Sequence, residues 1–284
     1  MALIILVLSI DSFPYSEPLE YWRFLSHDGY LLGYVTPEIA QRFQSGCHSD
    51  KFHVAEAERF VQIAESLASF KDRNRVFAEI ALAWRLNDEL LDKGWRSEHC
   101  TVAFSCLLGV VTYGVHINGY IPADRTKDKV MKMWISRRSA TKAKYPGKLD
   151  NTIAGGLGYP YGLWENVVKE CYEEGGLSAE FVEKKIVAAG AGHAQPEIEY
   201  VYDLAFDSET DNVPHPVDGE VEGFTLMRID AIKQSILAGE FKPNCALVIC
   251  DFMIRHGIMT AENEPNYLEI LSRIHRRFPF ALQQ

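Results

Sequence analysis

Residues Gly155–Leu177 read GGLGYPYGLWENVVKECYEEGGL, and this stretch decides the fold. A glycine-rich loop leads into a segment from about Leu163 to Glu174 that we expect to be a helix. On a helix, Glu170, Glu173 and Glu174 stand at positions i, i+3 and i+4, so their carboxylates project from one face. Such crowding of negative charge is costly without a cation.

Hard divalent cations such as Mg2+ and Mn2+ prefer oxygen ligands, and proteins usually hold Mg2+ with one or two carboxylates together with substrate phosphates. A solvated acidic helix face is the alternative for an arbitrary E-x-x-E-E segment. The residues that surround the three glutamates favour metal binding, because they complete a longer pattern.

The stretch resembles the signature of the Nudix family, G-x5-E-x7-R-E-U-x-E-E-x-G-U, in which U is aliphatic. Cys171 stands at an aliphatic position, and the residues that match at the required spacing are Gly155, Glu170, Glu173, Glu174, Gly176 and Leu177. Two positions depart, because Tyr161 replaces Glu and Lys169 replaces Arg. Lysine keeps the charge but lacks the guanidinium fork that binds a carboxylate at two points.

The resemblance implies that Mg2+ or Mn2+ is the cofactor. Glu173 and Glu174 would be the principal ligands, with Glu170 beside them and the Gly155 carbonyl as a backbone ligand. The loss of the loop glutamate at the position of Tyr161 leaves the number of metal ions open.

Glu165, on the first turn of the expected helix, could compensate for the missing loop glutamate. An ion pair with Lys169 at i+4 is the plainer role for Glu165.

Four further runs extend the resemblance over most of the chain: MWISRRS at Met133–Ser139, YPGKLDN at Tyr145–Asn151, DGEVEGF at Asp218–Phe224 and GEFKPNCALV at Gly239–Val248. They resemble a eukaryotic Nudix subfamily with an extra N-terminal domain, related to the module fused to thiamine pyrophosphokinase. Its members are linked to hydrolysis of thiamine diphosphate and its oxidised oxo and oxy analogues. The resemblance implies a small-molecule diphosphate substrate, cleaved to the monophosphate and inorganic phosphate, and fusion or association with thiamine pyrophosphokinase.

Two other functions stay open. One is a Nudix hydrolase for another organic diphosphate, such as a dinucleotide or a nucleoside diphosphate derivative. The other is a non-catalytic module that binds thiamine diphosphate, since Tyr161 and Lys169 depart from the signature.

Basic residues cluster before the motif at Arg137, Arg138, Lys142, Lys144 and Lys148, and could grip the diphosphate. A solubilising surface turn is the alternative. Because side chains alternate along a strand, we expect at most one of the two arginines to face the cleft.

Two pairs of polar residues share strand faces by a period of two. Glu220 and Glu222 form the first pair, and a glutamate there could act as a metal ligand or a general base, with strand solubilisation as the alternative. His116 and Asn118 form the second pair and could reach a ring or a phosphate. A hydrogen-bonded core histidine is the alternative for His116.

Apolar spacing predicts the other elements. We expect a hairpin at Tyr21–Val35, helices at Val54–Phe70, Arg73–Leu91, Ala231–Ala238, Asn244–His256 and Pro265–Phe278, and strands at Cys100–Leu108, Val110–Ile121, Val130–Arg138, Glu197–Phe206 and Gly223–Arg228. The predicted fold is a Nudix α/β/α sandwich with a mixed sheet over residues 98–284, preceded by a small α/β domain over residues 1–97.

Composition narrows the compartment and the partners. The chain has 284 residues, 47% of them hydrophobic, and a net charge of -10 with a pI near 5.4, which disfavours nucleic acid and anionic lipid. The cysteines form no C-x-x-C pair, so we expect the reducing cytoplasm. The apolar run Ala2–Ile10 is shorter than the roughly 20 residues that span a bilayer, and we expect a buried strand or helix there.

Overall fold

The computed structural model describes residues 3–11, 20–87, 100–142, 144–158, 160–193 and 197–276. The chain forms two compact units, Met1–Phe13 with Thr112–Arg277 and Pro14–Val111 with Phe278–Gln284. The expected boundary between residues 97 and 98 lies outside the described residues and stays a prediction.

The larger unit is built on a mixed sheet. Its described strands are β5 (Thr112–Ile121), β6 (Lys132–Arg138), β7 (Leu149–Asp150), β8 (Ile153–Gly156), β9 (Ile186–His193), β10 (Glu197–Ala205) and β11 (Val221–Arg228). They are ordered β11-β6-β5-β10-β9, with β7 paired to β6 and β8 paired to β5. Strands β5 and β10 run parallel, and the other pairs are antiparallel.

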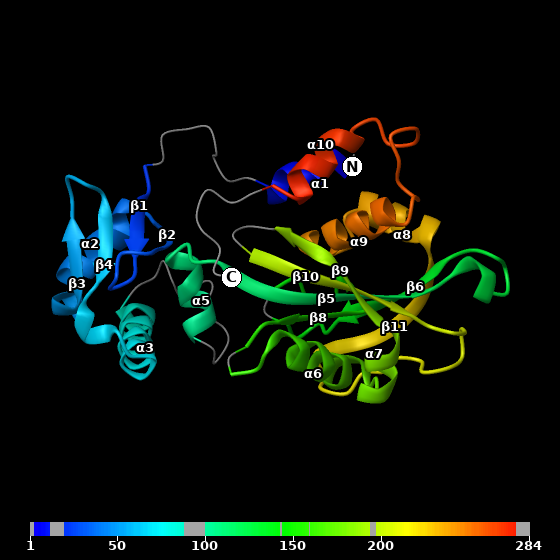
Figure 1. Ribbon diagram of the computed structural model, residues 1–284, viewed down its shortest axis with the longest axis horizontal. Coiled ribbons are helices and arrows are strands. Elements are labelled where there is room, and N and C mark those ends of the chain that lie inside the picture. The colour runs from blue at the N-terminus through cyan, green and yellow to red at the C-terminus, as the bar shows by residue number, and fades with distance from the viewer. Residues whose placement is uncertain are drawn as a thin grey trace. The chain divides into compact units, whose positions relative to one another are not determined.

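Helices cover both faces of this sheet: α1 (Leu3–Ile10), α6 (Leu163–Gly175), α7 (Ala179–Lys185), α8 (Ile229–Leu237), α9 (Pro243–Arg255) and α10 (Tyr267–Ile274). Figure 1 shows α6 and α7 on one side and α1, α9 and α10 on the other. Along β5, Val115 and Ile117 join the core beneath α6 and α7, whereas the ring of Tyr120 lies 5.2 Å from that of Phe252 on α9. The expected α/β/α sandwich with a mixed sheet is confirmed.

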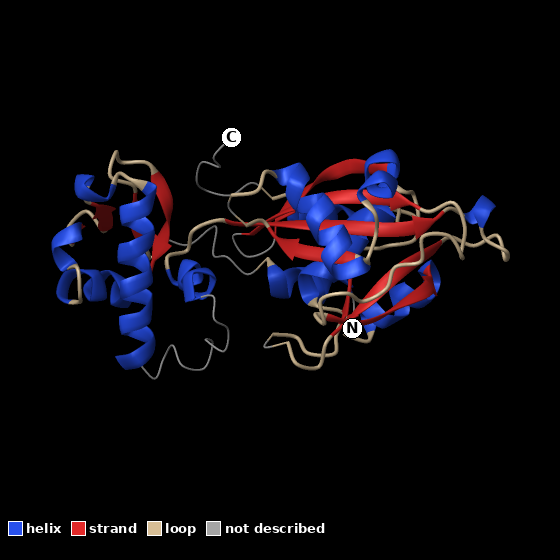
Figure 2. Ribbon diagram, turned by 90° about the horizontal axis from the view of Figure 1, so that it is seen from below, coloured by secondary structure: helices blue, strands red, loops and turns tan. Residues whose placement is uncertain are grey.

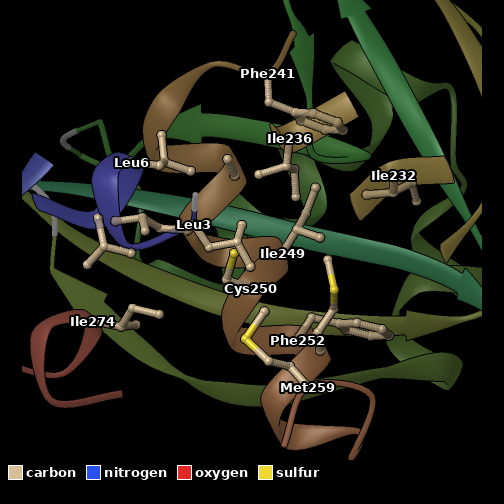
Figure 3. Packing of buried hydrophobic residues seen from close by; sticks show 14 of the residues in the cluster. Leu3, Leu6, Ile232, Ile236, Phe241, Ile249, Cys250, Phe252, Met259 and Ile274 are labelled. Atoms are coloured by element: carbon tan, nitrogen blue, oxygen red, sulfur yellow. The ribbon is translucent and has the colours of Figure 1, made fainter. Parts of the chain in front are cut away.

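Helix α1 belongs to the core of the larger unit and contacts α9 and α10. Figure 3 shows Leu3 and Leu6 among the buried side chains around Ile249 of α9. An ion pair of 2.7 Å between Asp11 and Arg273 fastens the end of α1 to α10. The buried element expected at residues 2–10 is therefore a helix. Within the described residues, no helix is both long and apolar enough to cross a bilayer.

The smaller unit combines a four-stranded sheet with helices (Figure 2). Its described elements are β1 (Trp22–Leu25), β2 (Leu31–Val35), α2 (Pro37–Ser45), β3 (Phe52–Ala55), β4 (Phe60–Ile63), α3 (Phe70–Asn87) and α5 (Cys100–Leu107). The strand order is β2-β1-β4-β3. Aromatic residues fill the core, where the rings of Phe43 and Trp84 lie 5.3 Å apart. The hairpin expected at Tyr21–Val35 is confirmed.

Two expected elements of this unit are wrong. The segment Val54–Phe70 contains the β3–β4 hairpin instead of a helix, because the chain turns before Arg59, which has a left-handed φ of 53°. Cys100–Leu108 contains helix α5 instead of a strand. The ring of Phe104 on α5 packs 5.3 Å from Trp84 of α3, so tertiary packing outweighs the local strand preference.

The other expected elements are present with shifted ends, and the end of the helix expected at Arg73–Leu91 lies outside the described residues. Helices α2 and α7 and strand β9 were not predicted. Short elements such as these carry too few apolar repeats for a clear periodicity.

The position of α1 can be tested by burying a charge. Val7 is 1% exposed and Ile5 is 52% exposed on the same helix. We expect Val7→Asp to lower the free energy of unfolding by about 3 kcal/mol, because it buries an unpaired carboxylate, while Ile5→Asp has little effect. Urea unfolding of both variants checks this. Equal stability of the two variants would contradict the packing of α1.

Candidate active site

The order of strand, glycine loop and helix expected around the motif is confirmed. Strand β8 ends at Gly156 and α6 begins at Leu163. At the start of α6, the Glu165 carboxylate accepts a hydrogen bond of 2.9 Å from the backbone N–H of Gly162. The side chain of Asn166 closes the loop by donating to the Gly162 carbonyl at 3.0 Å. These contacts fix where the helix begins.

Helix α6 ends in a glycine turn. Gly176 has a φ of 63°, a conformation that favours glycine. The N–H groups of Gly176 and Leu177 donate to the carbonyls of Tyr172 and Cys171 at 2.9 and 3.1 Å, as in a Schellman cap. A Cβ at Gly176 would also collide with the His215 ring. Both backbone conformation and packing therefore require glycine.

The three glutamates of α6 gather beside the end of β8. Glu174 is 7% exposed, and its carboxylate accepts a hydrogen bond of 2.9 Å from the backbone N–H of Ala154. Glu170 lies against Gly155, where a Cβ would collide with its carboxylate. The side chain of Glu173 is 45% exposed. The glycine thus lets a carboxylate of the helix approach the strand backbone.

The charges at this site are only partly balanced. The pKa of Glu174 is raised to about 8, chiefly by burial and in addition by the nearby carboxylates of Asp150 and Glu170. Burial also raises the pKa of Glu170. The Lys169 ammonium lies 3.1 Å from Glu170 and 2.5 Å from Glu173, so it bridges two of the glutamates. No ammonium within the described residues is paired with Glu174.

The donor set fits a hard divalent cation. Glu170, Glu173 and Glu174 offer carboxylate oxygens and Gly155 offers a carbonyl oxygen, which are the donors that Mg2+ and Mn2+ prefer. A cation here would also compensate the buried carboxylate. Lys169 retains contacts to two glutamates despite the departure from arginine.

Tyr161 lies in the loop before α6, and Glu165 lies in the first turn of α6. Tyr161 is 50% exposed. Glu165 caps the helix, so the expected ion pair with Lys169 is wrong: the ammonium binds Glu170 and Glu173 instead. The unpaired N–H groups of a helix start favour a carboxylate at Glu165.

The two arginines before the motif bind the loop between β6 and β7. Arg138 forms an ion pair of 2.8 Å with Asp150, and its guanidinium donates to the carbonyls of Lys144 and Tyr145 at 3.0 and 3.2 Å. Arg137 is exposed and donates to a carbonyl of the same loop at 2.7 Å. Their role in substrate binding stays a prediction.

The acidic residues before and within β11 extend the site. Glu220 is half exposed, pairs with Lys142 and helps to raise the pKa of Glu170, which places it near the α6 carboxylates. Asp218, which was not predicted, acts on Glu174 in the same way. The roles of Glu220 and Lys142 stay predictions, as does that of Lys144, which is exposed. Glu222 is also exposed.

His116 and Asn118 are buried on the opposite face of the sheet, which α9 covers. They are 3% and 0% exposed. His116 Nε2 lies 2.7 Å from Glu199, and Nδ1 lies 2.8 Å from the amide oxygen of Asn151. The Asn151 amide nitrogen donates to Asn118 at 2.9 Å. This is the arrangement of a hydrogen-bonded core histidine, and direct substrate binding stays a prediction.

Sequence analysis missed Asn151 and Glu199, which contact His116, and Asn244, which donates to Glu199. Two signals were available. Asp150, Asn151 and Thr152 form a polar run directly before β8, and three acidic residues of β10, Glu197, Glu199 and Asp203, share one face of the strand. Buried polar residues in such places need partners, which spacing alone does not identify.

The chain is similar in sequence to known proteins that include Nudix hydrolases. No model of a protein family matches the chain. The Uncharacterized protein YJR142W of Saccharomyces cerevisiae is 38% identical over 290 residues, covering 90% of this chain and 83% of that protein. Nudix hydrolase 20, chloroplastic, of Arabidopsis thaliana is 33% identical over 240 residues, covering 77% of this chain and 62% of that protein.

A solved structure, the Nudix domain of Shewanella oneidensis NrtR complexed with ADP ribose, is 11% identical with a TM-score of 0.40 and covers 61% of this chain and 97% of that chain. The Arabidopsis relative supports the Nudix hydrolase family for this chain. The chain spans 62% of that relative's length.

The burial of Glu174 predicts a pH-dependent stability. Its pKa is raised from 4.5 to about 8 in the folded protein, so the metal-free protein loses stability as the pH rises through that range. Glutamine does not titrate. We therefore expect Glu174→Gln to be more stable than the wild type by on the order of 2 kcal/mol at pH 7, with a smaller difference at pH 4.5.

Thermal midpoints in a chelator, measured at both pH values, check this expectation. Glu183→Gln, an exposed carboxylate on α7, is the control and should follow the wild type. A Glu174→Gln variant whose midpoint parallels the wild type at every pH would show that the carboxylate is not buried as described.

Proposed function

We propose that this protein is a metal-dependent Nudix diphosphatase that cleaves thiamine diphosphate and its oxidised oxo and oxy analogues to the monophosphate and inorganic phosphate. The observation that carries the hydrolytic part is the gathering of Glu170, Glu173 and Glu174 beside the Gly155 carbonyl. The sequence runs outside the helix support the choice of thiamine diphosphate.

In this proposal, Glu170, Glu173, Glu174 and the Gly155 carbonyl hold Mg2+ or Mn2+. A cation held by these residues would supply positive charge to the diphosphate oxygens and would lower the pKa of a water molecule. The backbone N–H of Ala154 holds the Glu174 carboxylate toward the strand. The Lys169 ammonium pairs with Glu170 and Glu173, so both ion pairs would have to open for these carboxylates to bind one cation.

Residues around the carboxylates have separate proposed roles. Glu220 would accept the proton from the attacking water, and this requires its ion pair with Lys142 to open. Arg137, Lys142 and Lys144 would contact the diphosphate. The guanidinium of Arg138 is occupied by Asp150 and loop carbonyls, so its contribution would be to hold the loop that carries the other basic residues.

The proposal extends to partners and location. The resemblance of the flanking runs to the fused module supports fusion or association with thiamine pyrophosphokinase. The cysteines whose side chains are described form no disulfide bond, and this supports a reducing compartment such as the cytoplasm as the proposed location. The relative Nudix hydrolase 20 is named as chloroplastic.

The metal role of Glu173 has a direct test. We expect Glu173→Gln to reduce Mg2+-dependent phosphate release by at least about 100-fold, because the amide removes a charged ligand while the half-exposed position leaves folding intact. Glu183→Gln should keep wild-type activity. Near-normal hydrolysis by Glu173→Gln, with an unchanged thermal midpoint, would refute the assignment.

Substrate choice requires a panel at matched Mg2+. We expect kcat/KM for thiamine diphosphate or its oxo and oxy analogues to exceed that for ADP-ribose and dinucleoside polyphosphates by at least about tenfold, a difference of about 1.4 kcal/mol in transition-state binding. Preference for a nucleotide would assign the chain to another organic diphosphate. Calorimetric binding of thiamine diphosphate without phosphate release would instead indicate the non-catalytic module.

A further inference from the structure

A buried polar network that the proposed reaction does not use lies beneath α9. We define the His116 network as His116, Asn118, Asn151, Glu199 and Asn244. His116, Asn118, Asn151 and Glu199 are each at most 3% exposed. They come from β5, from the segment before β8 and from β10, and Asn244 on α9 donates to Glu199 at 2.8 Å. Polar groups this deep are costly unless their partners are precisely provided for.

His116 is the centre of the network, and its surroundings define its charge. Nε2 faces the Glu199 carboxylate at 2.7 Å and Nδ1 faces the Asn151 amide oxygen at 2.8 Å. Oxygen atoms that face both ring nitrogens favour a proton on each of them, as in an imidazolium. Burial alone would lower the pKa of His116, but the Glu199 carboxylate raises it well above its usual value.

The same region could be mistaken for a second metal site. Donor atoms of His116, Asp150 and Cys245 lie within 4.8 Å of one another. However, both nitrogens of His116 face other partners, and Asp150 pairs with Arg138 at 2.8 Å. The buried Lys242 ammonium also interacts with Asp150 and Cys245. A divalent cation would add positive charge to a cluster that already contains the cationic groups of His116, Arg138 and Lys242.

The network holds the strand that leads to the metal site. Asn151 is bound through its side chain by His116 and through its carbonyl by the Ser136 hydroxyl at 2.6 Å. The next residue, Thr152, donates to the Trp134 carbonyl at 2.6 Å. His116 is also the register partner of Ala154 on β8. Side-chain hydrogen bonds and backbone strand pairing therefore both fix the position of this segment.

The consequence reaches the metal ligands directly. Ala154 supplies the N–H that binds Glu174, and Gly155 supplies the carbonyl assigned to the metal. A shift of the preceding strand would move both groups together. Ligand geometry in a metal site depends on such outer contacts.

We propose that His116 is a positioning residue for the metal site, which holds Asn151 and thereby the strand that presents Ala154 and Gly155 to α6. The inference rests on the proposed function, because it concerns the same metal site. It replaces contact between His116 and substrate with an indirect role.

Direct measurement of Mn2+ binding to the full chain, by the electron paramagnetic resonance signal of free Mn2+, tests this role without substrate. We expect His116→Gln and Asn151→Ser each to raise the Mn2+ dissociation constant about tenfold. The double variant should bind no more weakly than the weaker single variant, since both substitutions break one connection.

Asp251→Asn is the matched control. Asp251 is a buried carboxylate on α9 that pairs with Arg255 at 2.6 Å, outside the His116 network. It should lower the thermal midpoint without changing Mn2+ affinity. If His116→Gln and Asn151→Ser behave like this control, with Mn2+ affinity within twofold of the wild type, the positioning role is overturned.

A milder variant covers the case in which both substitutions prevent folding. Glu199→Gln keeps the size of the side chain and an oxygen for Asn244 but removes the charge opposite His116. Weaker Mn2+ binding supports the proposal, and unchanged binding overturns it. A wild-type protein that binds Mn2+ but hydrolyses no diphosphate would refute the proposed function and leave this test readable, whereas one that binds no Mn2+ would overturn both.

Discussion

The hydrogen bond from the Ala154 N–H to the buried Glu174 carboxylate is the contact on which the site depends. It joins β8 to α6, so the strand that ends in glycine and the helix that carries the glutamates are held as one piece. Burial makes this carboxylate hard to ionise without a positive partner. A cation bound here, as the proposed function requires, would compensate the charge of the ionised carboxylate.

Helix α6 carries apolar residues on one face and carboxylates on another. Cys171 is fully buried and Val167 lies beside it in the core, while Glu173, two residues after Cys171 and across the helix from it, is half exposed. The helix therefore binds the sheet through one stripe and presents carboxylates along its edge. Stability on one side of the helix and ligand chemistry on the other come from the same thirteen residues.

The sequence was most informative where local chemistry determines the structure. Gly176 requires a left-handed conformation and Glu170 needs the space that Gly155 leaves, so spacing alone located the loop and helix. It was least informative where distant partners decide. Nothing local indicates that Phe104 packs on Trp84 and makes α5 a helix, or that Asn151 and Glu199 meet at His116. The partner of Lys169 was only partly predictable, because Glu165 and the neighbouring Glu170 and Glu173 were all within reach along the helix.

Helix α1 changes how the two units are related along the chain. It packs in the larger unit, yet residues 14–111 of the smaller unit follow it before β5 begins. In chain order, residues 14–111 of the smaller unit therefore lie between two parts of the larger unit. A fragment that starts at residue 98 would lack α1 and leave apolar side chains of α9 and α10 uncovered, so the two units cannot be separated by a single cut.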